Sequence, residues 1–194
     1  MELTHALYRY CDLPFDARRC FDLAWCYEQQ QQLASAFGFY LRAAQQSEDS
    51  QLNYESLLRA AFCFERQGSR PASTKHLFEY AIGASPLRPE AYYHICRFME
   101  WINDWPQILL FASMGLSHCD AAVLPSITDL EYPGAYALKF YRALSLYHVG
   151  DAETSIKLFA ELNNDKTVNE TYSKLIAHNL SFVSTVKAKN YPKG

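Results

Sequence analysis

The sequence predicts an all-α fold, a right-handed superhelical stack of about four helical hairpins with a capping helix at its C-terminal end. Three observations lead to this prediction. A small residue followed three positions later by a large one recurs at Ala24 and Tyr27, Ala61 and Phe64, Cys96 and Met99, and Ala143 and Leu146. A turn and a second helical stretch follow each of these pairs. Between residues 16 and 187, no run of β-branched residues bounded by turn residues predicts a strand.

The first half of the chain is expected to hold a short helix and two hairpins. Residues 3–12 form a lead-in helix that ends before Pro14, because proline disfavours helical geometry in the residue before it. Asp16 caps the next helix, and Pro71 begins a later one, where its missing N–H costs nothing. The two hairpins are expected at about 16–47 and 51–86, with helices at 16–30, 33–47, 51–67 and 71–84.

The second half is expected to hold two further hairpins and the capping helix. Pro89 begins the third hairpin, and Trp105-Pro106 begins its second helix. These hairpins are expected at about 89–117 and 135–163, with helices at 89–102, 105–117, 135–149 and 151–163. A last helix at about 168–187 carries an apolar stripe and closes the open end of the stack. The basic tail, 188–194, is expected to be disordered.

An insertion separates the third hairpin from the fourth. The step between small residues lengthens from 35 residues (Ala61 to Cys96) to 47 (Cys96 to Ala143), so about a dozen residues are added within 117–134. Loops of this length in compact domains are often functional. The alternative is a surface crossover packed by Leu124, Ile127 and Tyr132.

Composition indicates a single packed domain spanning 1–194, since 49% of the residues are hydrophobic and 20% are charged. The net charge of −3 argues against a nucleic-acid partner, for which a basic face is expected. The six cysteines form no C-x-x-C pair, which predicts small, buried thiols in a reducing compartment. The N-terminus lacks the apolar run of a secretory signal, and no run of apolar residues is long enough to span a membrane. We therefore expect a cytoplasmic protein.

Hairpins near 34 residues long that meet through small side chains are typical of tetratricopeptide repeats (TPR). Several strings also resemble the TPR-like region that accompanies family 2 glycosyltransferases in bacteria and phages: residues 39–44 (FYLRAA), 63–68 (CFERQG), 88–92 (RPEAY), 111–116 (FASMGL), 129–134 (DLEYPG) and 179–182 (NLSF). The resemblance covers roughly residues 20–183. In such proteins the catalytic part is a separate α/β domain with a sugar-nucleotide site, which this sequence does not contain.

The residues give no support for catalysis. No G-x-S-x-G, P-loop or G-x-G-x-x-G motif is present. The pair Asp129-x-Glu131 follows no predicted strand, so a loop or capping role is favoured over a metal site. Residues 118–120 (HCD) are consecutive and cannot converge on one atom, and His94 is expected to pack rather than act as a base. We therefore predict no enzyme activity, no catalytic residue, no metal and no cofactor.

Curved stacks of hairpins expose a concave groove lined by the first helix of each pair. The shared register predicts that these side chains face it: Arg18, Phe21, Trp25, Glu28, Leu58, Phe62, Glu65, Arg66, Tyr93, Arg97, Glu100, Trp101, Phe140, Leu144, Tyr147 and His148. Aromatic and arginine side chains are the usual anchors of protein contacts. Alternatively, with only four hairpins, the terminal helices fold over the groove and these aromatic side chains form core.

The leading functional prediction is a non-catalytic interaction module, a scaffold or adaptor for a protein or peptide partner, which could serve a glycosyltransferase. One alternative is a structural subunit of a larger assembly. A glycan-transfer enzyme or a glycan-binding protein, with sugar stacked on Trp25 or Trp101, is less favoured. The partner, the oligomeric state and the role of the insertion do not follow from the sequence.

Overall fold

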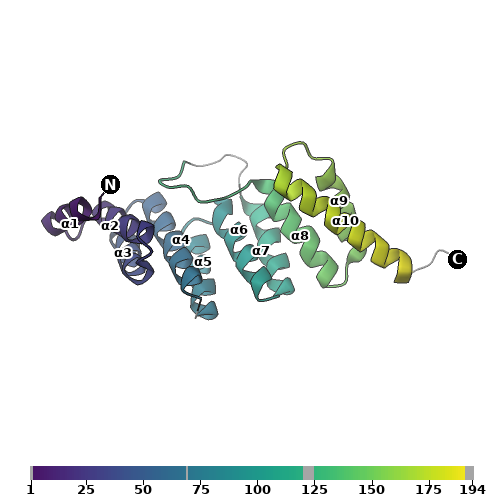
Figure 1. The fold of residues 1–194 in the computed structure, drawn as a ribbon, viewed down its shortest axis with the longest axis horizontal. Coiled ribbons are helices and arrows are strands. Elements are labelled where there is room, and N and C mark those ends of the chain that lie inside the picture. Colours follow the sequence, from purple (N-terminus) through teal and green to yellow (C-terminus); the bar gives the residue numbers. More distant parts are fainter. Residues whose placement is uncertain (1, 69, 120–124, 191–194) are drawn as a thin grey trace. The chain divides into compact units, whose positions relative to one another are not determined.

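The computed structural model describes residues 2–68, 70–119 and 125–190, with side chains up to residue 185 (Figure 1). Every regular element in these ranges is helical, so the all-α prediction is confirmed. The helices are α1 Leu3–Asp12, α2 Ala17–Gln29, α3 Leu33–Gln46, α4 Ser50–Gln67, α5 Pro71–Ala84, α6 Pro89–Trp101, α7 Trp105–His118, α8 Ala135–His148, α9 Ala152–Asn163 and α10 Glu170–Asn190.

The helix bounds agree with the predicted ones to within about two residues, except at the C-terminal end. Helix α10 continues to Asn190 and so includes the first residues of the segment expected to be a disordered tail. The stretch 181–190 contains neither proline nor glycine, so it holds no residue that disfavours a helix strongly. The remaining residues of that tail, 191–194, lie outside the described residues.

Helix starts follow the predicted capping chemistry. The side chain of Asp16 accepts a hydrogen bond from the backbone N–H of Arg19 at 2.8 Å. Asp104, just before Trp105-Pro106, accepts from the backbone N–H of Gln107 at 3.3 Å. Each cap satisfies a backbone donor that the first turn of a helix leaves without a partner.

The four hairpins share one turn conformation. The residue seven positions after each small residue has a positive φ: 60° at Gln31, 77° at Gly68, 58° at Asn103 and 99° at Gly150. In three of the turns, the backbone N–H of the next residue donates to the carbonyl of the large residue of the register, at 3.0 Å from Gln32 to Tyr27, 3.0 Å from Asp104 to Met99 and 2.9 Å from Asp151 to Leu146. This left-handed ending satisfies carbonyl groups at the end of the first helix and turns the chain into the second.

The small residues of the register lie in the core. Ala24, Ala61, Cys96 and Ala143 are all fully buried. Gly115 on α7 is a further close contact, because a Cβ atom there would lie 2.9 Å from the Cβ of Tyr92. The small residues of the register therefore lie in the core, and Gly115 allows a close approach of α7 to Tyr92 on α6.

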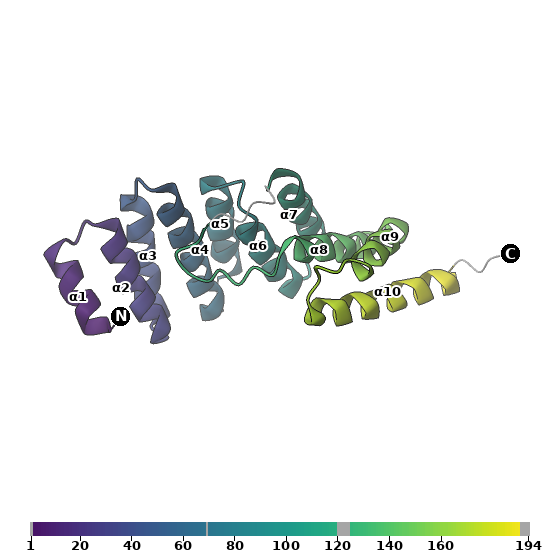
Figure 2. The same ribbon diagram turned by 90° about the horizontal axis from the view of Figure 1, so that it is seen from above.

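The chain divides into two compact units, residues 1–91 with 122–130, and residues 92–121 with 131–194. In the first unit, α3 packs between α2 and α4, α4 packs on α5, and the first helices α2 and α4 also contact each other. In the second unit, α8 packs on α7 and α9, and α10 contacts both α9 and α8. Helix α10 thus takes the place of the first helix of a further pair, which is the predicted capping position (Figure 2).

All six cysteines are free, and four of them are buried. Cys11 is exposed and Cys119 is partly exposed, which departs from the expectation that all six are buried. None of the helices in the described ranges has the length and apolar character needed to cross a membrane.

Candidate functional site

Helix α4 carries three polar side chains on one face, one per turn. Gln51, Glu55 and Arg59 are spaced by four residues, so they follow one another along the helix surface. Glu55 is fully buried and Arg59 is 5% exposed, although charged side chains are rarely buried without partners. We name these three residues the α4 row.

The partners of the α4 row are backbone groups of the insertion. Gln51 Nε2 donates to the carbonyl of Pro125 at 2.7 Å. The Glu55 carboxylate accepts from the backbone N–H groups of Ile127 at 2.6 Å and Thr128 at 3.0 Å. Arg59 donates to the carbonyl of Asp129. The segment therefore runs along α4 in the direction of the helix, and Figure 2 shows it beside α4.

The backbone is bent at Ile127 and Thr128, and the bend directs two consecutive N–H groups to one carboxylate. Successive N–H groups that converge in this way form an anion-binding concavity, here with a side-chain carboxylate as the anion. Hydrogen bonds to an ionised acceptor are about twice as strong as neutral ones. The Glu55 carboxylate therefore fixes the bend of the segment.

The hydroxyl of Thr128 contacts both charged members of the α4 row. It donates to Glu55 Oε2 at 3.2 Å and accepts from Arg59 Nε at 3.1 Å. A hydroxyl supplies one donor and two acceptor lone pairs, so serine or threonine fits between these two side chains. In this contact the α4 row binds a side chain of the segment. Its other contacts with the segment are to backbone groups.

A second buried arginine holds the start of the segment. Arg88 donates to the carbonyl of Pro125 at 3.1 Å and to Glu90 at 2.7 Å. Glu90 also accepts from the Tyr54 hydroxyl at 3.1 Å, and burial, with the nearby Glu90 carboxylate, raises the pKa of Tyr54 well above its usual range. Arg88 is thus fixed by groups that lie within the same unit.

Arg59 joins the α4 row to helix α2. Its guanidinium lies 3.4 Å from the Glu28 carboxylate and 4.6 Å from the centroid of the Trp25 ring. Glu28 also pairs with Arg66 at 3.1 Å and accepts from the Tyr40 hydroxyl at 2.7 Å. Two arginines and a hydroxyl therefore satisfy the buried Glu28 carboxylate.

The structure divides the predicted groove residues of the first unit into core and surface. Phe21, Leu58 and Phe62 are buried, as the alternative interpretation of a filled groove expects. Arg18 is exposed and pairs with Asp22 at 3.1 Å. Trp25, Glu65 and Arg66 are at least partly accessible.

A pocket lies beside Trp25. Its volume is 430 Å³, and its lining comes from the start of α1 and the second half of α2: Glu2, Leu3, Thr4, Trp25, Cys26, Gln29 and Gln30. One side of Trp25 therefore faces open space, while its ring also contacts Arg59.

In the second unit, several predicted groove residues belong to an aromatic cluster. Tyr93 and Phe140 are buried, and the Tyr172 ring lies 5.3 Å from that of Phe140. Glu100 accepts from the Tyr141 hydroxyl at 3.1 Å, and burial raises the pKa of this carboxyl despite that hydrogen bond. Leu144 and, in part, Arg97 are buried as well.

The remaining predicted residues of the second unit lie nearer the surface. Trp101 is 67% exposed. His148 stacks on Trp105 with ring centroids 3.7 Å apart, and burial lowers its pKa. The Tyr147 ring lies 5.9 Å from that of Phe182 on α10. The second unit thus presents one strongly exposed aromatic anchor among the predicted residues.

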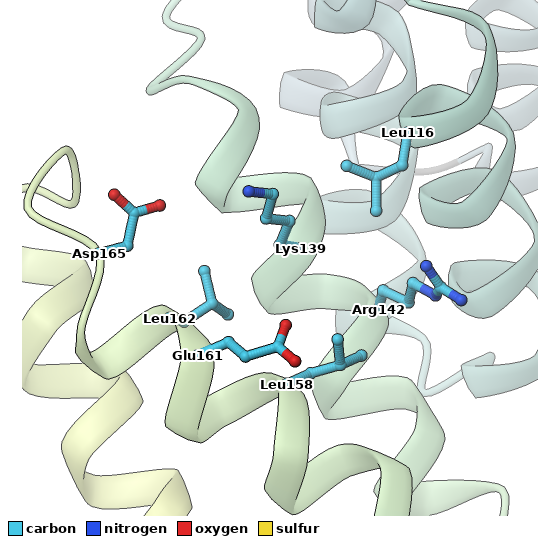
Figure 3. A pocket seen from close by; sticks show the side chains of 7 residues that line it. All are labelled: Leu116, Lys139, Arg142, Leu158, Glu161, Leu162 and Asp165. Carbon is cyan, nitrogen blue, oxygen red and sulfur yellow. The ribbon is translucent and has the colours of Figure 1, made fainter.

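Figure 3 shows a pocket of 340 Å³ within the second unit, formed by α7, α8, α9 and the chain just after α9. It is lined by Leu116, Lys139, Arg142, Leu158, Glu161, Leu162 and Asp165. Two basic and two acidic side chains balance each other, so the pocket selects neither anions nor cations.

Within the described residues, no group of three or more His, Cys, Asp or Glu side chains could hold a metal ion. His94 is buried beside the Tyr93 ring, as predicted for a packing residue. His118 is the last residue of α7, and Asp120 lies outside the described residues.

Sequence reasoning missed Gln51, Glu55, Arg59 and Arg88. The signal available in the sequence was the spacing of four residues between Gln51, Glu55 and Arg59, on a helix whose other residues are mostly apolar. Their role depends on a segment far along the chain, with separations of 74 for Gln51 and Pro125, 72 for Glu55 and Ile127, and 37 for Arg88 and Pro125. Helical periodicity carries no information on such a contact.

Repeated hairpins, small residues at helix contacts and a shared left-handed turn define a TPR-like helical repeat protein. Among solved structures, the chain is similar to YrrB, a TPR protein with an unusual peptide-binding site, with a TM-score of 0.67, 14% identity, and coverage of 94% of this chain and 83% of YrrB. It is also similar to a variant of nearly identical TPR-like repeats from a putative kinesin light chain of Podospora anserina, with a TM-score of 0.55, 15% identity, and coverage of 89% and 95%.

No protein-family model and no curated protein matches the chain. At such low sequence identity, the similarity to these two structures establishes the fold alone. Neither neighbour links the chain to a glycosyltransferase.

Proposed function

We propose that this chain is a non-catalytic interaction module that binds a peptide segment of a partner protein on the first helices of its hairpins. The observation that carries the proposal is the α4 row, where buried polar side chains bind the backbone of a non-helical segment. A surface that binds backbone groups is suited to a peptide ligand, because every peptide presents the same N–H and C=O groups. The peptide-binding site reported for YrrB, on a similar fold, supports the same function.

Accessible side chains on the first helices would supply further contacts. Arg66 at the end of α4 and Trp101 at the end of α6 are of the residue types that anchor protein contacts. The pocket beside Trp25 offers space for a side chain of the partner. The strings that resemble glycosyltransferase-associated regions make a separately encoded glycosyltransferase one partner to look for.

An affinity pull-down with mass spectrometry tests this function. The Arg66→Glu, Trp101→Ala double variant changes two first helices, and the Lys75→Glu, Tyr80→Ala variant makes matched changes on the second helix α5, where Tyr80 is 65% exposed. We expect a partner that is retained by the wild type and the α5 variant and lost by the first. A partner list that is the same for all three proteins would refute binding on the first helices.

A second candidate function is that of a structural subunit within a larger assembly. It is favoured by exposed apolar side chains on α10, where Leu175 is 43% and Phe182 51% exposed. Helix α10 would then contact a further subunit rather than cap the stack. Light scattering of the Leu175→Glu, Phe182→Glu variant tests this: a loss of mass relative to the wild type supports it, and an equal mass opposes it.

A further inference from the structure

We propose that the α4 row is a specific peptide site whose resident ligand is the chain's own segment 125–130, and that a partner segment with a serine or threonine two positions before an apolar residue replaces it. This inference deepens the proposed function, on which it rests, by naming the site and the class of ligand.

The contacts define what the site recognises. Glu55 takes two consecutive N–H groups, so the ligand must bend at that point and cannot have proline at either position. The hydroxyl between Glu55 and Arg59 selects serine or threonine at the position of Thr128. Leu130, two positions later, is 4% exposed, which adds an apolar requirement.

The resident segment is held mainly by polar contacts. Pro125, Ser126 and Asp129 are exposed, and Ile127 and Thr128 are half-buried. Leu130 is the one buried side chain of the segment, so the segment buries less apolar area than the helices and its opening costs less than unfolding of the helices beneath it. Its release leaves Glu55 and Arg59 without these partners, so a second segment with the same groups regains the same hydrogen bonds.

The resident segment competes with any added peptide, because it is covalently part of the same chain. A segment tethered within the chain has an effective concentration on the order of millimolar, so it weakens binding of the same sequence added in solution. The site is therefore occupied in the free chain and responds to ligands that exceed the resident segment in affinity or local concentration.

A peptide-exchange experiment tests this. Fluorescein-labelled peptide of residues 125–132 with blocked ends is titrated by anisotropy into the wild type and into a variant with residues 125–130 replaced by six alternating glycines and serines. We expect the variant to bind at least about tenfold more tightly than the wild type. Methylation of the peptide's nitrogens at Ile127 and Thr128, or Thr128→Val in the peptide, should weaken binding about tenfold.

If the glycine-serine variant does not fold, the full chain with Thr128→Val replaces it, because valine keeps the shape of threonine and removes only the hydroxyl contacts. This variant should bind the unmodified peptide several-fold more tightly than the wild type, and the exposed Ser126→Ala variant should match the wild type. The inference is overturned if a folded variant shows no such gain, or if N-methylated and unmodified peptides bind equally.

Light scattering of the wild type adds one more outcome. A dimer that dissociates when the glycine-serine sequence is introduced would identify a second copy as the occupant, and would also overturn the inference. The peptide assay requires no natural partner. Its failure therefore refutes this site and leaves the proposed function to the pull-down.

Discussion

The carboxylate of Glu55 binds Thr128 twice, through its backbone N–H at 3.0 Å and its hydroxyl at 3.2 Å. A fully buried acid thus depends on a segment far away in the sequence for most of its hydrogen bonds, with Gln51 on the same helix as a further donor at 3.3 Å. Such an arrangement is costly to leave incomplete, since a buried polar group without a partner loses its hydration and gains nothing in return. Residues 125–130 of the insertion are therefore part of the folded first unit, held by polar contacts as well as by packing. Leu124, expected to pack in a surface crossover, lies outside the described residues.

Removal of the acid should destabilise the first unit. Glu55→Ala leaves the N–H groups of Ile127 and Thr128 without their acceptor, and we expect the free energy of unfolding to fall by about 2–4 kcal/mol. Urea denaturation followed by circular dichroism measures the change. Glu48→Ala, on an exposed residue just before α4, should stay within about 0.5 kcal/mol of the wild type. A similar small effect at Glu55 would show that the contact contributes little.

The left-handed turns predict an asymmetry among glycines. Gly68→Ala and Gly150→Ala should each lower the free energy of unfolding by about 1 kcal/mol, because φ is 77° and 99° and alanine is strained there. No atom lies within 4 Å of the added Cβ at either site, so the cost is conformational. Gly38→Ala, exposed within α3, is the control and should raise stability by up to about 1 kcal/mol. Thermal denaturation distinguishes the signs, and losses at all three glycines would contradict the assignment.

The thiols should differ in reactivity. Burial, with a contribution from the Glu28 carboxylate, raises the pKa of Cys63 to about 12. Since the thiolate is the reactive form, Cys63 should remain unmodified by iodoacetamide at pH 8 while exposed Cys11 reacts. Peptide mapping by mass spectrometry identifies the modified sites, and the same reaction in 8 M urea should modify both. Equal rates for Cys63 and Cys11 in the native protein would exclude burial of Cys63.

Glu100 should make the stability of the second unit depend on pH. Burial raises its pKa above the ordinary value of 4.5, so the folded state binds a proton that the unfolded state has already lost. The stability that this proton binding adds to the folded state is present below pH 4.5 and is lost as pH rises through the folded-state pKa of Glu100. The difference in unfolding free energy between Glu100→Gln and the wild type should therefore grow in favour of the variant over that range. A difference that is constant from pH 4 to about pH 7 would contradict the raised pKa.

Much of the fold follows from local chemistry and could be predicted. Asp16, Asp104 and the prolines at helix starts act on residues three or four positions away, and the left-handed residues lie seven positions after the small ones. These effects are readable along the chain. The division into two compact units depends on contacts between residues far apart in the sequence, so it could not be predicted from composition.

The site was predicted less well, for a physical reason. Periodicity identified the side of α2 and α4 that faces inward, and Glu28 and Arg66 on that side do meet, at 3.1 Å. It could not distinguish accessible positions from covered ones, so Phe21 and Phe62 were expected to line a groove and are buried. Helical periodicity also could not show that Glu55 contacts Thr128, because this contact depends on the path that residues 125–130 take along α4.

Residues 125–129 follow α4 from its N-terminal end to its middle, with Pro125 at Gln51 and Asp129 at Arg59. A peptide ligand must therefore bind with its chain running in the same direction as α4. A peptide with the same residues in reverse order would present its N–H groups and its hydroxyl in the wrong sequence to Gln51, Glu55 and Arg59. The amino-acid composition of a peptide alone therefore does not make it a ligand for this surface. A search for partners among protein sequences has to match the residues in the order of segment 125–130, from N- to C-terminus.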